Sequence, residues 1–173
     1  MTNSIGMTLV LMPSGLWVGK YEVTRGEYGR VMETTVSDNQ NERLPANRVA
    51  WDDANEFCRR LTEKEAAKLK GKVYSLPTQK QWEEFSAGQK LEELPPGSLK
   101  TSLQEPAAVI ETSANKLGLY GVLGNVWEWC LDGGSETSRL QKGGEYNSTN
   151  YNRLVAPSKP RPNSGFRCVL VQK

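Results

Sequence analysis

The run from Leu117 to Cys130, LGLYGVLGNVWEWC, constrains the fold more than any other part of the chain. Glycine or asparagine interrupts it at four closely spaced positions, Gly118, Gly121, Gly124 and Asn125. Such breaks favour neither a continuous helix nor a continuous strand. Trp127 and Trp129 are nevertheless large side chains that require burial. We therefore expect an irregular coil packed against the core.

The segments around this coil show the patterns of strands. Residues 9–12 and 16–23 are rich in strand-forming side chains and flank a Pro-Ser-Gly turn, which predicts a hairpin. Residues 73–76 predict a short extended segment. Residues 165–171, GFRCVLV, predict an apolar strand that closes the domain.

Three helices are expected between these strands. Thr24-x-x-Glu27 and Thr78-x-x-Gln81 are capping boxes, each of which can satisfy free amides at a helix start. Between them, apolar residues recur at helical spacing from Ala54 to Leu61. Residues 90–115 contain three prolines and little periodicity, so we expect a long surface excursion. The order of strands, helices, loops and strands predicts one α+β domain with an antiparallel sheet.

The chain of 173 residues contains no histidine, which excludes many enzyme classes. Ser-His-Asp and Cys-His nucleophile pairs, and zinc or iron sites that use histidine, are all impossible. The three cysteines, Cys58, Cys130 and Cys168, form neither a close metal-binding pair nor an even disulfide framework. Reduced or partly paired thiols fit this count best.

The charge is unevenly distributed although the formal net charge is only +2. Residues 146–173 contain no Asp or Glu, while the cations there are Arg153, Lys159, Arg161, Arg167 and Lys173. The whole chain gives no argument for nucleic acid as a partner. The cationic segment is either a solvated loop face or a surface for an acidic, sulfated or phosphorylated partner.

The sequence shows neither a membrane-spanning stretch nor a signal peptide pattern. The sequence fits two cellular locations: the cytoplasm, or export as part of a longer protein or particle.

Several short blocks, taken in order, resemble the formylglycine-generating enzyme (sulfatase-modifying factor) family. They are GKYEVT at 19–24, VAWDDA at 49–54, LPT at 76–78, GLY at 118–120, GNVWEW at 124–129, Gly143-Gly144 and Gly165-Phe166-Arg167. The resemblance implies a variant of the C-type lectin fold over one domain, residues 1–173. That fold has short antiparallel sheets, two to three helices and much irregular loop. The resemblance also implies that Cys58 and Cys168 lie close together, where family members often carry a disulfide.

The resemblance does not extend to the family's chemistry. Oxidase members bind copper through two cysteines beyond the glycine pair, where this chain has Ser148 and Arg153. A hydroxyl or a guanidinium cannot replace a thiolate as a copper ligand. The iron-dependent members need histidine. Family members also hold calcium near Gly124, Val126 and Glu128, but Gly121 stands where a ligand oxygen is expected. We expect no metal and no cofactor, with Glu128 as a buried acceptor for loop amides.

Residues 145–164 are the expected ligand-binding surface, because their amides, hydroxyls and tyrosines are typical of diversified binding loops. The tract also resembles the variable region of diversity-generating retroelement proteins, which implies non-enzymatic binding of a protein or surface glycan. The candidate ligand-binding residues are Tyr146, Asn147, Ser148, Thr149, Asn150, Tyr151, Asn152, Arg153, Ser158, Lys159, Arg161, Asn163 and Ser164.

Three alternatives stay open at this point. The tract fits an ordinary polar loop. The chain fits a copper-dependent formylglycine-generating-type oxidoreductase with relocated thiols, or an appended regulatory or sensor domain of a larger bacterial protein such as a kinase.

Overall fold

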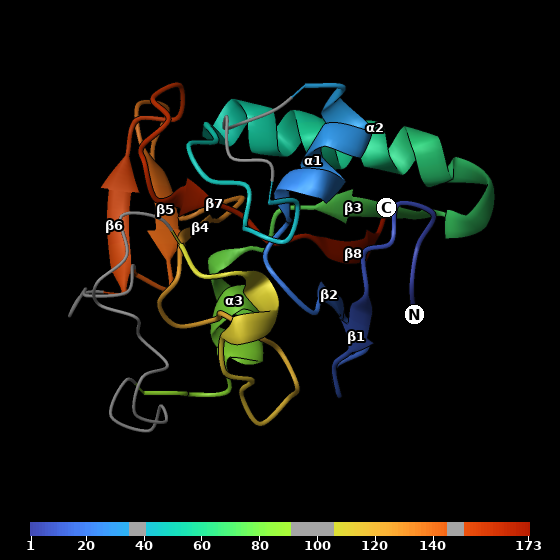
Figure 1. Cartoon of the computed structure of the whole chain (residues 1–173), viewed down its shortest axis with the longest axis horizontal. Helices are drawn as coiled ribbons and strands as arrows, with labels where there is room; N and C mark the ends of the chain where they lie inside the picture. Colours follow the sequence, from blue (N-terminus) through green and yellow to red (C-terminus); the bar gives the residue numbers. More distant parts are fainter. Residues whose placement is uncertain (35–40, 91–105, 145–150) are drawn as a thin grey trace.

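The structure, a computed structural model, describes residues 1–34, 41–90, 106–144 and 151–173. Its first sheet has the strand order β1-β2-β8-β3, with β1 Leu9–Leu11, β2 Trp17–Gly19, β8 Val169–Gln172 and β3 Lys72–Ser75 (Figure 1). Every neighbouring pair in this sheet is antiparallel. The predicted N-terminal hairpin is confirmed, although its second strand ends at Gly19. The predicted extended segment at residues 73–76 is confirmed as β3.

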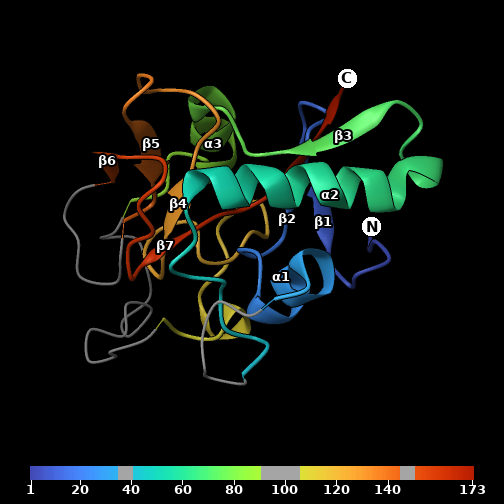
Figure 2. The same cartoon turned by 90° about the horizontal axis from the view of Figure 1, so that it is seen from above.

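The three predicted helices are confirmed as α1 Arg25–Met32, α2 Trp51–Leu69 and α3 Gln79–Ser86. Both capping boxes form, so Thr24 and Thr78 each accept a bond from the amide three residues ahead. Helix α2 lies along one side of the first sheet, beside β3 (Figure 2). Phe57 and Leu61 of α2 pack into a core cluster with Phe166 and Leu170.

The second sheet has the order β6-β5-β4-β7 and forms the other end of the molecule in Figure 1. Its strands are β4 Trp127–Trp129, β5 Arg139–Lys142, β6 Asn152–Val155 and β7 Ser164–Gly165. The pairs β4–β5 and β5–β6 are antiparallel, as expected, but β4 and β7 run parallel. Helix α3 packs against the second core cluster, where Trp82 and Phe85 meet Leu140 and Val169.

The prediction of one closing strand over residues 165–171 is wrong. The segment contributes β7 to the second sheet and β8 to the first, and Phe166, Arg167 and Cys168 connect them. The change of sheet takes place at Arg167, whose side chain is fully buried and whose guanidinium donates to the carbonyls of Gly19 and Tyr120. Because Gly19 ends β2 of the first sheet and Glu128, another acceptor of Arg167, lies on β4 of the second, this side chain connects the two sheets.

The coil before β4 is irregular and buried, as its sequence predicts. Gly118, Gly121, Gly124 and Asn125 all have positive φ, and Leu119, Val122 and Val126 are buried. The expected surface excursion is described only at its two ends, residues 90 and 106–115. Its later end is not a surface loop there, because Val109 of the 3-10 helix Val109–Glu111 and Asn115 are both buried.

No helix among the described residues is long and apolar enough to cross a membrane.

Candidate functional site

The described part of the expected binding tract is a strand and a loop at the edge of the second sheet. Asn152, Ser158, Lys159 and Arg161 are exposed, Tyr151, Arg153 and Asn163 are half-buried, and Ser164 is buried. Tyr151 packs against the second core cluster, so part of its ring area is already in contact with the domain. Tyr146, Asn147, Ser148, Thr149 and Asn150 lie outside the described residues.

Arg153 on β6 is the centre of a set of side-chain contacts. Its Nε donates to Gln141 Oε1 at 2.7 Å, and one Nη donates to Ser164 Oγ at 3.2 Å. Its guanidinium lies 4.3 Å from the centroid of the Trp127 ring, which is the geometry of a cation–π contact. We call these four residues, Trp127, Gln141, Arg153 and Ser164, the Arg153 cluster.

Strand register brings the Arg153 cluster together on one face of the second sheet. Gln141 of β5 stands opposite Arg153 of β6, and Trp127 of β4 stands opposite Ser164 of β7. Of the four, the sequence predicted binding roles for Arg153 and Ser164, treated Trp127 as scaffold and missed Gln141. Only the alternation of side-chain direction along β5 could have pointed to Gln141, and that alternation does not reveal which strand lies beside β5.

The loop between β6 and β7 is fixed through its backbone. The carbonyl of Pro157 accepts from the Trp51 amide at 2.9 Å, and the carbonyl of Pro162 accepts from Asn47 Nδ2 at 2.8 Å. The carbonyl of Asn163 accepts from the Trp127 amide at 2.8 Å. Because these bonds use main-chain atoms, the exposed side chains of this loop can differ without loss of its anchoring.

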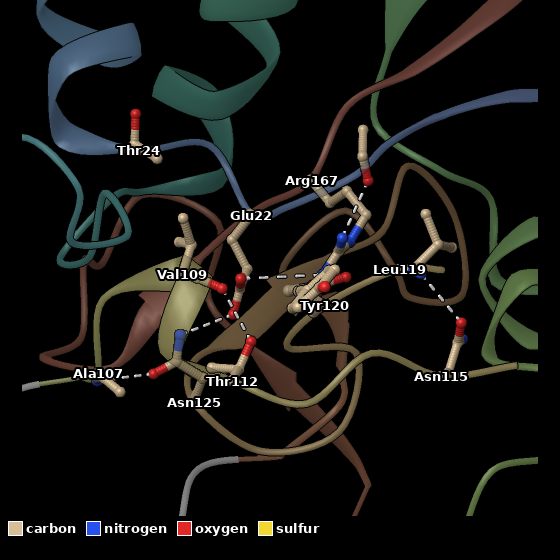
Figure 3. A network of polar contacts seen from close by, with 12 residues as sticks. Glu22, Thr24, Ala107, Val109, Thr112, Asn115, Leu119, Tyr120, Asn125 and Arg167 are labelled. Atoms are coloured by element: carbon tan, nitrogen blue, oxygen red, sulfur yellow. Dashed lines mark hydrogen bonds and ion pairs between the residues drawn. The ribbon is translucent and has the colours of Figure 1, made fainter. Parts of the chain in front are cut away.

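A second set of buried polar groups lies behind the coil before β4 (Figure 3). Arg167 donates to Glu128 Oε1 from two nitrogens, at 2.7 and 3.0 Å. Asn125 Nδ2 donates to Glu22 Oε1 at 2.9 Å, and Glu22 Oε2 lies 4.0 Å from Arg167. Burial raises the pKa of Glu22 to about 7, although the Arg167 charge opposes that shift.

These groups do not fit the calcium site found in family members. Gly121 lies against Glu22, because a Cβ at Gly121 would stand 2.6 Å from Glu22 Cδ. Glu128 already accepts from the Arg167 guanidinium and, at 2.9 Å, from the Trp82 indole. The expectation that Glu128 accepts from loop amides is therefore wrong: its partners are two side chains. A cation at Glu128 would compete with the positive charge of Arg167.

The three cysteine thiols are buried, and none of the three residues belongs to the tract. Cys58 of α2 and Cys168 lie with their sulfur atoms 3.6 Å apart, which confirms the expected proximity. Burial raises the pKa of the Cys130 thiol and of the Cys168 thiol. A raised pKa leaves little thiolate near neutral pH, and the thiolate is the form that attacks a substrate or binds a metal.

Comparison with known proteins identifies the domain type. A family model described as a sulfatase-modifying factor enzyme 1-like domain matches residues 7–171. The chain is 28% identical over 224 residues to the chaperone protein LppX of Paenibacillus barcinonensis, with 90% of this chain and 80% of that protein covered. It is 31% identical over 156 residues to the inactive C-alpha-formylglycine-generating enzyme 2 of Mus musculus. That alignment covers 72% of this chain and spans about half, 48%, of the mouse protein.

A solved structure has the same fold. Variable protein 1 of Treponema denticola superposes with a TM-score of 0.75 at 20% sequence identity, covering 91% of this chain and 84% of that chain. Together with the two four-stranded sheets and three α-helices of the described residues, this confirms the expected C-type lectin variant.

Proposed function

The chain belongs to the sulfatase-modifying factor enzyme 1-like domain family, and we propose that it uses this fold to bind a ligand rather than to catalyse a reaction. The proposal treats residues 1–173 as one domain with residues 145–164 as its binding region. The partner is a protein or a surface glycan, and no cofactor or nucleic acid takes part.

The observation that carries the proposal is the role of Arg153. The resemblance to oxidase members places a copper-binding thiol at this position, but here a guanidinium is bonded to Gln141 and Ser164 and covers the Trp127 ring. A positively charged donor cannot bind copper or pass electrons. It can hold an acceptor group of a ligand through several N–H groups.

The surface around Arg153 supports the same function. Lys159 and Arg161 are exposed on a loop whose backbone bonds to Trp51, Asn47 and Trp127. A rigid support with varied polar side chains is how diversified binding proteins present their contacts. In this proposal Tyr146 and Tyr151 are stacking anchors, the amides of Asn147, Asn150 and Asn152 are hydrogen-bonding contacts, and Arg153, Lys159 and Arg161 supply positive charge.

Selection of binders from two libraries tests the proposal. The purified chain is screened against a glycan array and a displayed random peptide library, and the affinity of each binder is measured by biolayer interferometry. Replacing Tyr146, Tyr151 and Arg153 together by alanine is expected to weaken binding by about tenfold or more, because such anchors carry most of the energy of an interface.

The matched control replaces Lys64 and Lys68, which are exposed on α2, by alanine. It should change the affinity by less than about twofold, since these side chains lie outside the tract. Binding that survives the triple substitution would contradict the assignment of this surface. Copper-dependent turnover of a Cys-x-Pro-x-Arg peptide by the intact chain would overturn the non-enzymatic function and restore the oxidoreductase.

A further inference from the structure

Two buried N–H groups in the Arg153 cluster have no acceptor among the described residues. They are Gln141 Nε2 and Trp127 Nε1. Gln141 is fully buried and Trp127 is 3% exposed. A buried donor without an acceptor is unfavourable, and each such group in a folded protein calls for an explanation.

Chemistry fixes the orientation of the Gln141 amide. The end that faces Arg153 Nε must be the oxygen, because an arginine nitrogen can only donate. The same oxygen accepts from Ser164 Oγ at 3.3 Å. The NH2 end of Gln141 is therefore the end left without an acceptor, and exchanging the two ends would set donor against donor.

The Trp127 indole differs in this respect from three other indoles of the chain. Trp51 donates to the carbonyl of Cys130 at 2.8 Å, Trp82 to Glu128 at 2.9 Å and Trp129 to the carbonyl of Val49 at 2.9 Å. The fold thus provides an oxygen for each of these three indoles but none among the described residues for Trp127.

The missing partner is an acceptor, and the local charge favours a negative one. Residues 146–173 contain no Asp or Glu, and Arg153 lies in contact with both Gln141 and Trp127. The side-chain oxygens of Gln141 and Ser164 are already bonded within the cluster. A carboxylate brings two oxygens with several acceptor positions, which matches two N–H donors beside a guanidinium.

We propose that the Arg153 cluster is a subsite for a carboxylate of the ligand, carried by a Glu or Asp side chain of a partner protein. The proposal rests on the proposed function and names the chemistry of its ligand. A protein is favoured over a sugar because β6 is an outer strand of the described second sheet and Leu154 on it is 61% exposed. An outer strand with an exposed apolar side chain suits an extended polypeptide.

Heteronuclear NMR with a simple acidic probe tests the subsite directly. The 15N-labelled chain is titrated with hexaglutamate, and hexaglutamine serves as the uncharged control. The indole N–H signal of Trp127, assigned with Trp127→Phe, and the side-chain amide of Gln141 are expected to shift with hexaglutamate only. The indole signals of Trp82 and Trp129, whose acceptors lie within the protein, should stay in place.

Two matched variants separate the subsite from general charge attraction. Gln141→Glu keeps the oxygen that Arg153 and Ser164 need but removes the N–H donor, and it lowers the net charge by one. Lys64→Gln lowers the net charge equally at an exposed position of α2, outside the tract. The first variant should weaken hexaglutamate binding by about tenfold or more and the second by less than about twofold. Equal weakening by the two would overturn the proposal.

A third probe, oligogalacturonate, decides where the carboxylate comes from. Shifts of Trp127 with this sugar but not with hexaglutamate would overturn the acidic protein as partner. If peptide binders from the library depend on the tract but carry no acidic residue and leave Trp127 unshifted, this inference fails while the proposed function stands. If the binders do not depend on the tract at all, the proposed function fails, and this inference fails with it.

Discussion

Gly121 shows how a missing side chain leaves room for a buried polar group. Its φ is +64°, and a Cβ there would stand 2.6 Å from Glu22 Cδ, whereas Gly118 at φ +77° has no atom within 4 Å of its Cβ position. Gly118→Ala should therefore cost about 1 kcal/mol from backbone strain alone. Gly121→Ala should cost about 1 to 3 kcal/mol more, because it also collides with Glu22. Urea denaturation measures both, and equal losses would contradict the collision.

Glu22 makes stability depend on pH in a defined direction. Burial raises its pKa from 4.5 to about 7, while Arg167 opposes the shift and Glu128 adds to it. Between these two pKa values the folded protein binds more protons than the unfolded chain, so the free energy of unfolding falls as the pH rises. The stability that protonated Glu22 contributes is complete below pH 4.5 and is lost above about pH 7.

Glu22→Gln should remove this pH dependence while it keeps an oxygen for Asn125. We expect the stability of the native chain, relative to the variant, to decline from about pH 4.5 to about pH 7. Urea denaturation at several pH values in that interval measures the difference. A difference that stays constant across the interval would show that Glu22 does not titrate there.

Among the elements, helix α3 depends on its first turn. Thr78 accepts from the amide of Gln81, and Gln81 Oε1 accepts from the amide of Thr78 at 2.9 Å. Thr78→Ala should lower the free energy of unfolding by about 1 kcal/mol, while Thr78→Ser keeps the hydroxyl and should lose much less. Chemical denaturation of the two variants checks this. The same helix carries Trp82 and Glu83, which bond to Glu128 and Lys142.

The helices could be predicted because their signals are local. A capping box or a run of apolar residues at helical spacing is complete within about ten residues. The closing segment could not be predicted in the same way, since its division into β7 and β8 depends on Arg167 reaching Gly19 and Tyr120. Those carbonyls lie far away in the sequence, so alternation within residues 165–171 does not reveal them.

The candidate site was predictable to a similar extent. The composition of residues 145–164 indicated a binding tract, and the resemblance located Arg153 where a thiol stands in oxidases. Gln141 could not be found, because its role comes from the register between β5 and β6, and register follows from tertiary packing. The part of the tract from Tyr146 to Asn150 lies outside the described residues, so the binding role of these residues stays a prediction.

Across the whole molecule, Cys58 and Cys168 connect α2 with the segment that joins the two sheets. Their sulfur atoms lie 3.6 Å apart although 110 positions separate them in the sequence. Oxidation with diamide should raise the melting temperature, because closing so long a loop is worth about 4 to 5 kcal/mol on the chain-entropy model.

Cys58→Ser is the control for this prediction, since it removes the sulfur that lies 3.6 Å from the Cys168 sulfur. Calorimetry of oxidised and reduced samples measures the melting temperature, and mass spectrometry confirms the bond. A shift that persists in Cys58→Ser, or no shift in the native chain, would contradict a bond between these thiols.

The place of β8 between β2 and β3 has a consequence for synthesis on the ribosome. The hairpin β1–β2 is translated first, but its inner neighbour consists of residues 169–172, and the second sheet likewise waits for residues 164–165. Until those residues leave the exit tunnel, neither sheet is complete, and both core clusters lack the side chains that this segment contributes. The nascent domain therefore exposes apolar surface until residues 164–172 have emerged, so its two sheets cannot be completed from the N-terminus onward.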